Sequence, residues 1–127
     1  MKLIGLLLGA LLTLSSLNAA AFEKDAASRT TKVHLSAEKP LVVGNNALQL
    51  ALTQNGVALD DATVVVKAFM PAMPGMPYME SKVEATSLGK GLYGAELNFS
   101  MGGTWQIHIF VTPKEGKKVR IKTSLNL

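Results

Sequence analysis

The chain has 127 residues and a formal net charge of +4, and 48% of its residues are hydrophobic while 17% are charged. This length fits one ordinary domain rather than two. The complete absence of cysteine excludes a disulfide scaffold, a thiolate metal site and a redox-active thiol pair. Eleven glycines and five prolines with no fixed period also exclude a collagen-like chain.

The N-terminus has the three parts of a secretory signal. Met1-Lys2 provides a positive start, residues 3–14 are almost wholly apolar, and small residues dominate positions 15–21. Polar residues interrupt the apolar run before it reaches the roughly 20 residues that a membrane anchor needs. We therefore expect residues 1–21 to be a cleavable signal peptide. The rest of the chain is expected in the periplasm, in contact with the membrane only during export.

After the signal, residues 22–31 are polar and rich in small side chains, which predicts a flexible lead-in. From residue 32 onward apolar residues recur with a period of two, as in half-buried β-strands. This alternation predicts strands at 32–36, 48–53, 64–69, 82–86, 92–99, 104–111 and 118–123. No segment beyond the signal has a convincing helical period.

Turn signals separate these strands, and Asn55-Gly56 is the strongest of them because both positions tolerate positive φ. Short half-buried strands at this density predict an all-β domain over residues 32–127, an antiparallel immunoglobulin-like β-sandwich of about seven strands. The single tryptophan, Trp105, is the expected anchor of its core. A small closed barrel is the alternative fold.

One segment is unlike the rest of the chain. From residue 70 to residue 79 the sequence is MPAMPGMPYM, which places methionines at every third position and follows three of them with proline. The four methionines are Met70, Met73, Met76 and Met79. A residue before proline is pushed out of the helical region, and proline cannot donate to a central sheet ladder. We therefore expect this loop to protrude or to run along a sheet edge.

Two conformations of the loop would bring its sulfurs to one side. In a straight polyproline II helix, with three residues per turn, all four thioethers line one face about 9 Å apart. Alternatively, Pro74 and Gly75 form the centre of a type II turn, and Met73 and Met76 face each other at its ends. The sequence does not choose between them.

Thioether sulfur is soft, uncharged and not protonated at working pH, and it selects Cu(I) or Ag(I) over hard ions. The methionine spacing therefore predicts a metal site. The competing interpretations are a contact surface for a protein partner and simple apolar packing, since methionine also serves both purposes.

Two further residues are candidate ligands. Met101 lies in a predicted turn and completes the site if that turn is at the same end of the sandwich as the methionine loop. His108 is expected on the face opposite Trp105, partly exposed, where it is either a copper ligand or an ordinary surface histidine. His34 is a weaker candidate of the same kind.

Other functions find little support. The basic residues between Lys117 and Lys122 are expected on the solvated face of a strand, so we expect no nucleic-acid binding. No histidine pair at metal-ligand spacing, no phosphate-binding loop and no nucleophile–base pair is evident. We therefore expect a protein that is not an enzyme.

The sequence also resembles a known family. Residues 46–50, 55–57 and 61–64 are similar to the opening strands of the YtkA-like domain family, which is related to FixH-like domains. The stretch 70–76 resembles that family's M-P-x-M-x-x-M loop. Two later stretches, 91–93 and 99–105, resemble its G-x-Y and F-x-M-x-G-x-W elements. The resemblance covers residues 32–126.

This resemblance implies an exported immunoglobulin-like sandwich linked to copper handling, and its copper-resistance determinant members, of the CrdA kind, are short exported proteins of this build. The chain lacks the histidine-rich N-terminal Cu(II) site of CopC-type copper carriers, and Tyr78 and Met79 stand where a histidine would follow the loop. Cu(I) is therefore the expected ion. The alternative is an interaction module that docks on an envelope efflux or oxidase-assembly complex through the loop.

Overall fold

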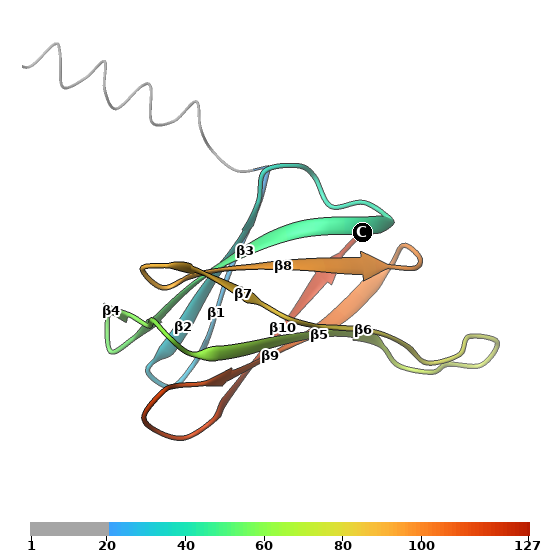
Figure 1. The fold of residues 1–127 in the computed structure, drawn as a ribbon. Helices are drawn as coiled ribbons and strands as arrows, with labels where there is room; N and C mark the ends of the chain where they lie inside the picture. The colour runs from blue at the N-terminus through green and yellow to red at the C-terminus, as the bar shows by residue number, and fades with distance from the viewer. Residues whose placement is uncertain (1–20) are drawn as a thin grey trace, which may run out of the picture.

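The structure is a computed structural model that describes residues 21–127. These residues form two antiparallel sheets packed face to face (Figure 1). The first sheet has the order β1-β2-β3-β8-β7, with β4 paired to β3, and contains β1 (Phe22–Ser28), β2 (Thr31–Ala37), β3 (Gly44–Gln54), β4 (Val57–Ala58), β7 (Thr86–Gly89) and β8 (Leu92–Phe99). The second has the order β10-β9-β5-β6 and contains β5 (Thr63–Met70), β6 (Met79–Glu84), β9 (Thr104–Thr112) and β10 (Val119–Asn126).

The all-β antiparallel sandwich predicted from the sequence is confirmed. The predicted signal peptide lies almost entirely outside the described residues. Within residues 21–127 no helix has both the length and the apolar character to cross a membrane.

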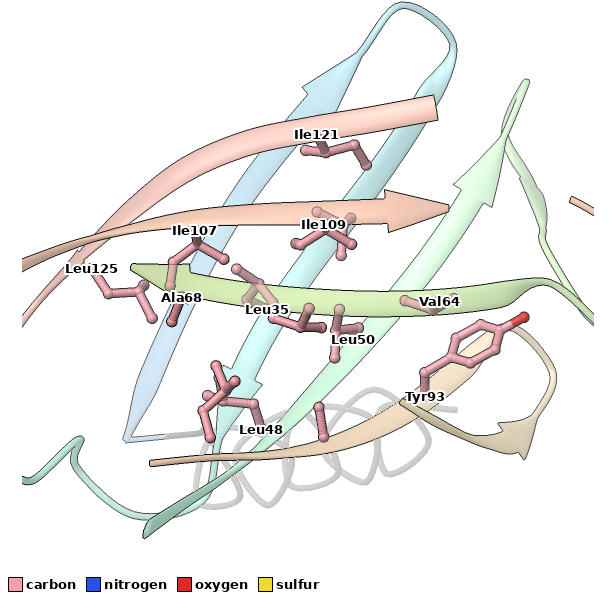
Figure 2. Close-up of a cluster of buried hydrophobic side chains, with 14 of the residues drawn as sticks. Leu35, Leu48, Leu50, Val64, Ala68, Tyr93, Ile107, Ile109, Ile121 and Leu125 are labelled. Atoms are coloured by element: carbon pink, nitrogen blue, oxygen red, sulfur yellow. The ribbon is translucent and has the colours of Figure 1, made fainter. Parts of the chain in front are cut away.

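The period of two builds the core between the sheets. Every second residue of the long strands is buried, and both inner faces contribute aliphatic side chains to one layer (Figure 2). Trp105 is 1% exposed, as expected, and its ring packs on Phe99 with the ring centroids 5.3 Å apart. Its indole Nε1–H donates to the Met101 carbonyl at 3.0 Å, so the buried ring also holds the β8–β9 turn in place.

The prediction of a flexible lead-in at 22–31 is wrong for most of that segment, because residues 22–28 form strand β1 and pair with β2. The inward-facing side chains of β1 are only half-buried, and most are small or polar, so the strand carries almost no hydrophobic period. Lys24 shows what holds it: its Nζ donates to the Ser124 carbonyl at 2.6 Å and links β1 to β10 at the edge of the other sheet.

The sequence also missed β4 and β7. All residues of these two short strands are exposed, so neither has a buried face that could produce an alternating pattern. The turn before β4 was predicted correctly, because Asn55 and Gly56 both have positive φ, at 54° and 80°.

Tyr93 fixes the connection that enters β5. Its ring is 1% exposed in the core, and its hydroxyl both donates to the Leu59 carbonyl at 2.7 Å and accepts from the Ala62 N–H at 3.1 Å. One side chain therefore satisfies two backbone groups of the loop that leads from the first sheet to the second.

We predict that Tyr93→Phe lowers the free energy of unfolding by about 1–3 kcal/mol, because two backbone groups lose their partner while the ring still packs. Urea denaturation measures this. Tyr78→Phe is the matched control. The exposed Tyr78 side chain donates its hydroxyl to Glu80, so losing this hydrogen bond should lower the free energy of unfolding much less. Equal losses in the two variants would contradict this role of Tyr93.

His34 joins β1 to β2 on the outer face of the first sheet. Its Nδ1 lies 2.6 Å from Asp25 Oδ1, and its Nε2 lies 3.4 Å from Glu23 Oε1. The hydrogen bond with Asp25 is the main reason that the pKa of His34 is raised, and desolvation only partly opposes it. Both ring nitrogens therefore face carboxylates, as suits a protonated imidazole.

The interactions that raise the pKa of folded His34 also stabilise the fold. Their contribution is fully present below about pH 6.5, the pKa in the unfolded chain, and it is lost as the pH rises through the higher pKa of the folded state. We predict that the urea midpoint of the wild type falls over this range more than that of His34→Gln. Denaturation curves at several values from about pH 5.5 to pH 8 measure the difference. Parallel pH profiles of the two proteins would contradict it.

Candidate metal site

The methionine segment forms the tip of the β5–β6 hairpin. Met70 ends β5 and pairs with Met79, which begins β6. Beyond this pair the two arms continue as a narrow loop that projects past the end of the sandwich (Figure 1). Met73 and Met76 close it by mutual backbone hydrogen bonds, from Met73 N to Met76 O at 2.9 Å and from Met76 N to Met73 O at 2.8 Å.

Pro74 and Gly75 are the two central residues of this turn. Gly75 has a φ of 80°, which a type II turn requires at its second central position, and proline suits the first. The primed turns of ordinary hairpins need a positive φ at the first position, which proline cannot adopt. Of the two predicted conformations, the structure therefore forms the turn and not the straight polyproline helix.

The four methionines share the inner side of the hairpin. Met70 is part of the buried core, and its register partner Met79 faces the same way. Met76 also packs against the core, and Met73 is its partner across the bridge. Residues 71–72 and 77–78 lie outside the strands, so the β period of two does not apply between the two methionine pairs.

We call these four methionines, together with Met101, the methionine cluster. Their exposure differs greatly. Met70 is only 5% exposed, so the expectation that the whole loop protrudes is wrong at its base, where the residue still belongs to β5. Met73 at the tip is 54% exposed. Met76, Met79 and Met101 are half-buried against the core. The cluster thus runs from a buried base to an accessible tip.

The β8–β9 turn, residues 100–103, lies against the hairpin. Ser100 Oγ–H donates to the Met79 sulfur at 3.1 Å. At the other end of the turn, a Cβ on Gly103 would lie 3.3 Å from the Met70 methyl carbon, so the glycine gives Met70 room to pack closely against the turn. The turn that carries Met101 is therefore at the same end of the sandwich as the methionine hairpin.

His108 is not brought to the cluster. It is half-buried, as expected, on the outer face of the second sheet, whereas Met70 points inward from the neighbouring strand. Its ring makes an edge contact with Phe69, with centroids 4.9 Å apart. Burial is the main cause that lowers the pKa of His108, followed by the charges of Arg120, Lys122 and Lys67. A histidine among cations is poorly placed to hold another cation.

The described part of the chain offers no hard-ligand alternative. Within residues 21–127, no group of three or more His, Cys, Asp or Glu side chains could hold a metal ion. The segment between Met70 and Met79 contains no charged residue at all. What gathers at this end of the sandwich is thus a set of neutral thioethers, whose chemistry suits a soft monovalent ion.

Sequence reasoning missed Ser100. It lies inside the stretch 99–105, but a single serine in a predicted turn carries no signal of its own. Its role follows only from the packing of the turn against β6, which no spacing along the chain reveals.

A β-sandwich with a methionine hairpin at one end defines a class of small all-β domain, and comparison with known proteins identifies the family. The YtkA-like family model matches residues 25–110, which include the second half of β1, the methionine hairpin and the β8–β9 turn. The chain belongs to the YtkA-like family. Neither the curated proteins nor the solved structures contain a significant match.

We predict that Gly75→Ala strains the turn by about 1–2 kcal/mol, because an L-residue at this φ is disfavoured while its Cβ meets no atom within 4 Å. Amide hydrogen exchange at Met73 and Met76 should accelerate about tenfold. Gly75→Asn is the control, since asparagine tolerates the left-handed region and should cost less. Unchanged protection in Gly75→Ala would show that the turn does not hold the bridge.

Proposed function

We propose that the protein is an exported, periplasmic copper-binding protein that sequesters or relays Cu(I) in copper resistance or homeostasis, and that it is not an enzyme. One observation supports this most strongly: the Pro74-Gly75 turn pairs Met73 with Met76 on the side that Met70 and Met79 also occupy. The neighbouring turn adds Met101. Membership in the YtkA-like family agrees with this reading of the hairpin.

The donor set favours Cu(I) over Cu(II). Neutral thioethers bind soft ions, while Cu(II) prefers imidazole and oxygen in tetragonal geometry. His108 is across the sheet from the cluster, and both nitrogens of His34 are engaged by carboxylates. In an oxidising compartment, methionine also supplies soft sulfur that does not form disulfides.

The gradient of exposure suits a carrier. Met73 is the most accessible sulfur and is the expected first contact for an incoming ion. Met79 already shares its sulfur with the Ser100 hydroxyl, so ligation there replaces or bends a weak hydrogen bond. Neutral ligands of graded accessibility can be exchanged one at a time, which allows release to a partner without unfolding of the sandwich.

We predict that replacement of Met73 and Met76 together by leucine weakens Cu(I) or Ag(I) binding about a hundredfold, because two soft donors are lost while size and apolarity are kept. Anaerobic competition with a chromogenic Cu(I) chelator measures the affinity. Circular dichroism and the urea midpoint should match the wild type, since Met73 is exposed and Met76 lies outside the buried core.

The matched control is His108→Gln, which removes an imidazole from the outer face of this sheet without touching the cluster. Its Cu(I) affinity should equal that of the wild type. An unchanged affinity in the leucine double variant, or an equal loss in His108→Gln, would contradict the assignment.

A second candidate function is an interaction module that docks on an envelope efflux or oxidase-assembly complex through the same hairpin. The exposed apolar surface of the projecting tip favours it, since Met73 is 54% and Tyr78 48% exposed between stiff prolines. Capture of such a complex by metal-free protein, retained in the leucine double variant, would support docking over metal binding.

A further inference from the structure

The outer face of the second sheet carries a row of basic residues across its four strands. Lys122 on β10 is directly opposite His108 on β9, His108 is opposite Lys67 on β5, and Lys67 is opposite Lys82 on β6. Strands are about 4.8 Å apart, so the row spans about 14 Å. We call it the basic row. Lys67 and Lys82 place like charges directly opposite each other, which destabilises a sheet, so fold stability alone does not account for this pair.

The charges on this face are largely unbalanced. Of the cations around the row, only Lys67 forms an ion pair within residues 21–127, with Glu80 at 3.5 Å. Arg120 and Lys118 extend the positive surface beside Phe110. Among the described strand residues of this face, only Glu80 and Glu84 are acidic, and both are on the edge strand β6. The depressed pKa of His108, caused in part by three of these cations, reports the same positive potential.

The opposite side of the sandwich has the other sign. On the outer face of the first sheet, Glu23, Asp25 and Glu96 outnumber Lys32 and His34, the latter with its raised pKa. Of the two outer faces, that of the second sheet therefore carries the positive excess.

Aromatic rings lie on both sides of the basic row. Tyr78 stacks on Phe69 with centroids 6.1 Å apart, Phe69 contacts His108, and His108 contacts Phe110 at 6.2 Å. The ammonium groups of Lys67 and Lys118 lie over Phe69 and Phe110, at 5.1 and 5.0 Å from the ring centroids. These rings form a continuous series on the outer face, and they offer apolar contact between its positive charges.

We propose that this face binds an acidic protein segment that also carries aromatic side chains. Carboxylates would pair with Lys67, Lys122 and Arg120, and the rings of the segment would pack beside Phe69 and Phe110. The two glutamates on β6 would repel the segment from that edge and keep it over β9 and β10. This surface is separate from the methionine cluster, which is on the inner side of the hairpin.

A protein segment fits this face better than an anionic membrane does. Membrane insertion needs apolar side chains that project, but Phe69 and Phe110 are half-buried on the sheet. Tyr78 is exposed, yet its hydroxyl is bound to Glu80 at 2.8 Å.

The test uses metal-free ¹⁵N-labelled protein titrated with a short peptide of alternating glutamate and phenylalanine, followed by amide chemical shifts. We expect perturbations over β5, β9 and β10 and an affinity that falls as salt rises. The double variant Arg120→Gln, Lys122→Gln should bind about tenfold more weakly. The control pair, Lys32→Gln with Lys90→Gln, removes the same charge elsewhere and should bind within about twofold of the wild type.

Several results would overturn the proposal: perturbations confined to β1 and β2 or to the hairpin tip, equal binding of a glutamine–phenylalanine peptide, or equal losses in the two double variants. Phosphatidylglycerol vesicles provide a further arm. Co-sedimentation with the wild type that is lost in the Arg120, Lys122 variant would assign the face to lipid instead. Because no metal is present, failure here leaves the Cu(I) proposal untouched.

Discussion

The paired backbone hydrogen bonds between Met73 and Met76 are the constraint on which the candidate site depends. They exist because Pro74 and Gly75 together satisfy a type II turn, in which each residue takes the φ that suits it. Without this closure, two arms rich in proline would have few ladder bonds to hold them together, and the methionines would face solvent independently. At the base, the Met70–Met79 pair is held in position by its packing in and against the core.

The sandwich therefore fixes the methionine cluster at its base and not at its tip. Met70 is held by the buried layer and by the close approach of Gly103, and Met79 is held by Ser100. Met73 has neither support. A buried base and an accessible tip are what a site needs if it is to capture an ion from solution and still release it, because the accessible ligand can leave while the others retain their geometry.

Much of this fold could be predicted from local pattern. The period of two identified the long strands, and Trp105 and the Asn55-Gly56 turn were placed correctly. Strand β1 could not be found, because its inward side chains are small or polar and gain their burial from pairing with β2 and from the Lys24 contact with Ser124. Whether a regular spacing of methionines is exposed could not be predicted either, since it depends on where β5 ends: Met70 is core and Met73 is surface.

The two proposed surfaces meet at one residue. Tyr78 is in the methionine hairpin, but its ring stacks on Phe69 and so continues the aromatic series of the basic face. A partner bound over β9 and β5 would lie beside the hairpin without covering its inner side. This arrangement would bring the metal-binding side chains of a partner close to the exposed tip. It would thus explain why the proposed docking surface and the proposed metal site are neighbours.

The most direct measurement of the central claim is an anaerobic titration of the protein with Cu(I), followed through the methyl resonances of its methionines by NMR. Our account predicts that the methyl signals of Met73, Met76, Met79 and Met101 shift together and saturate, while the ring signals of His108 stay in place. Methionine signals that do not respond to Cu(I), or a response confined to the histidines, would contradict it.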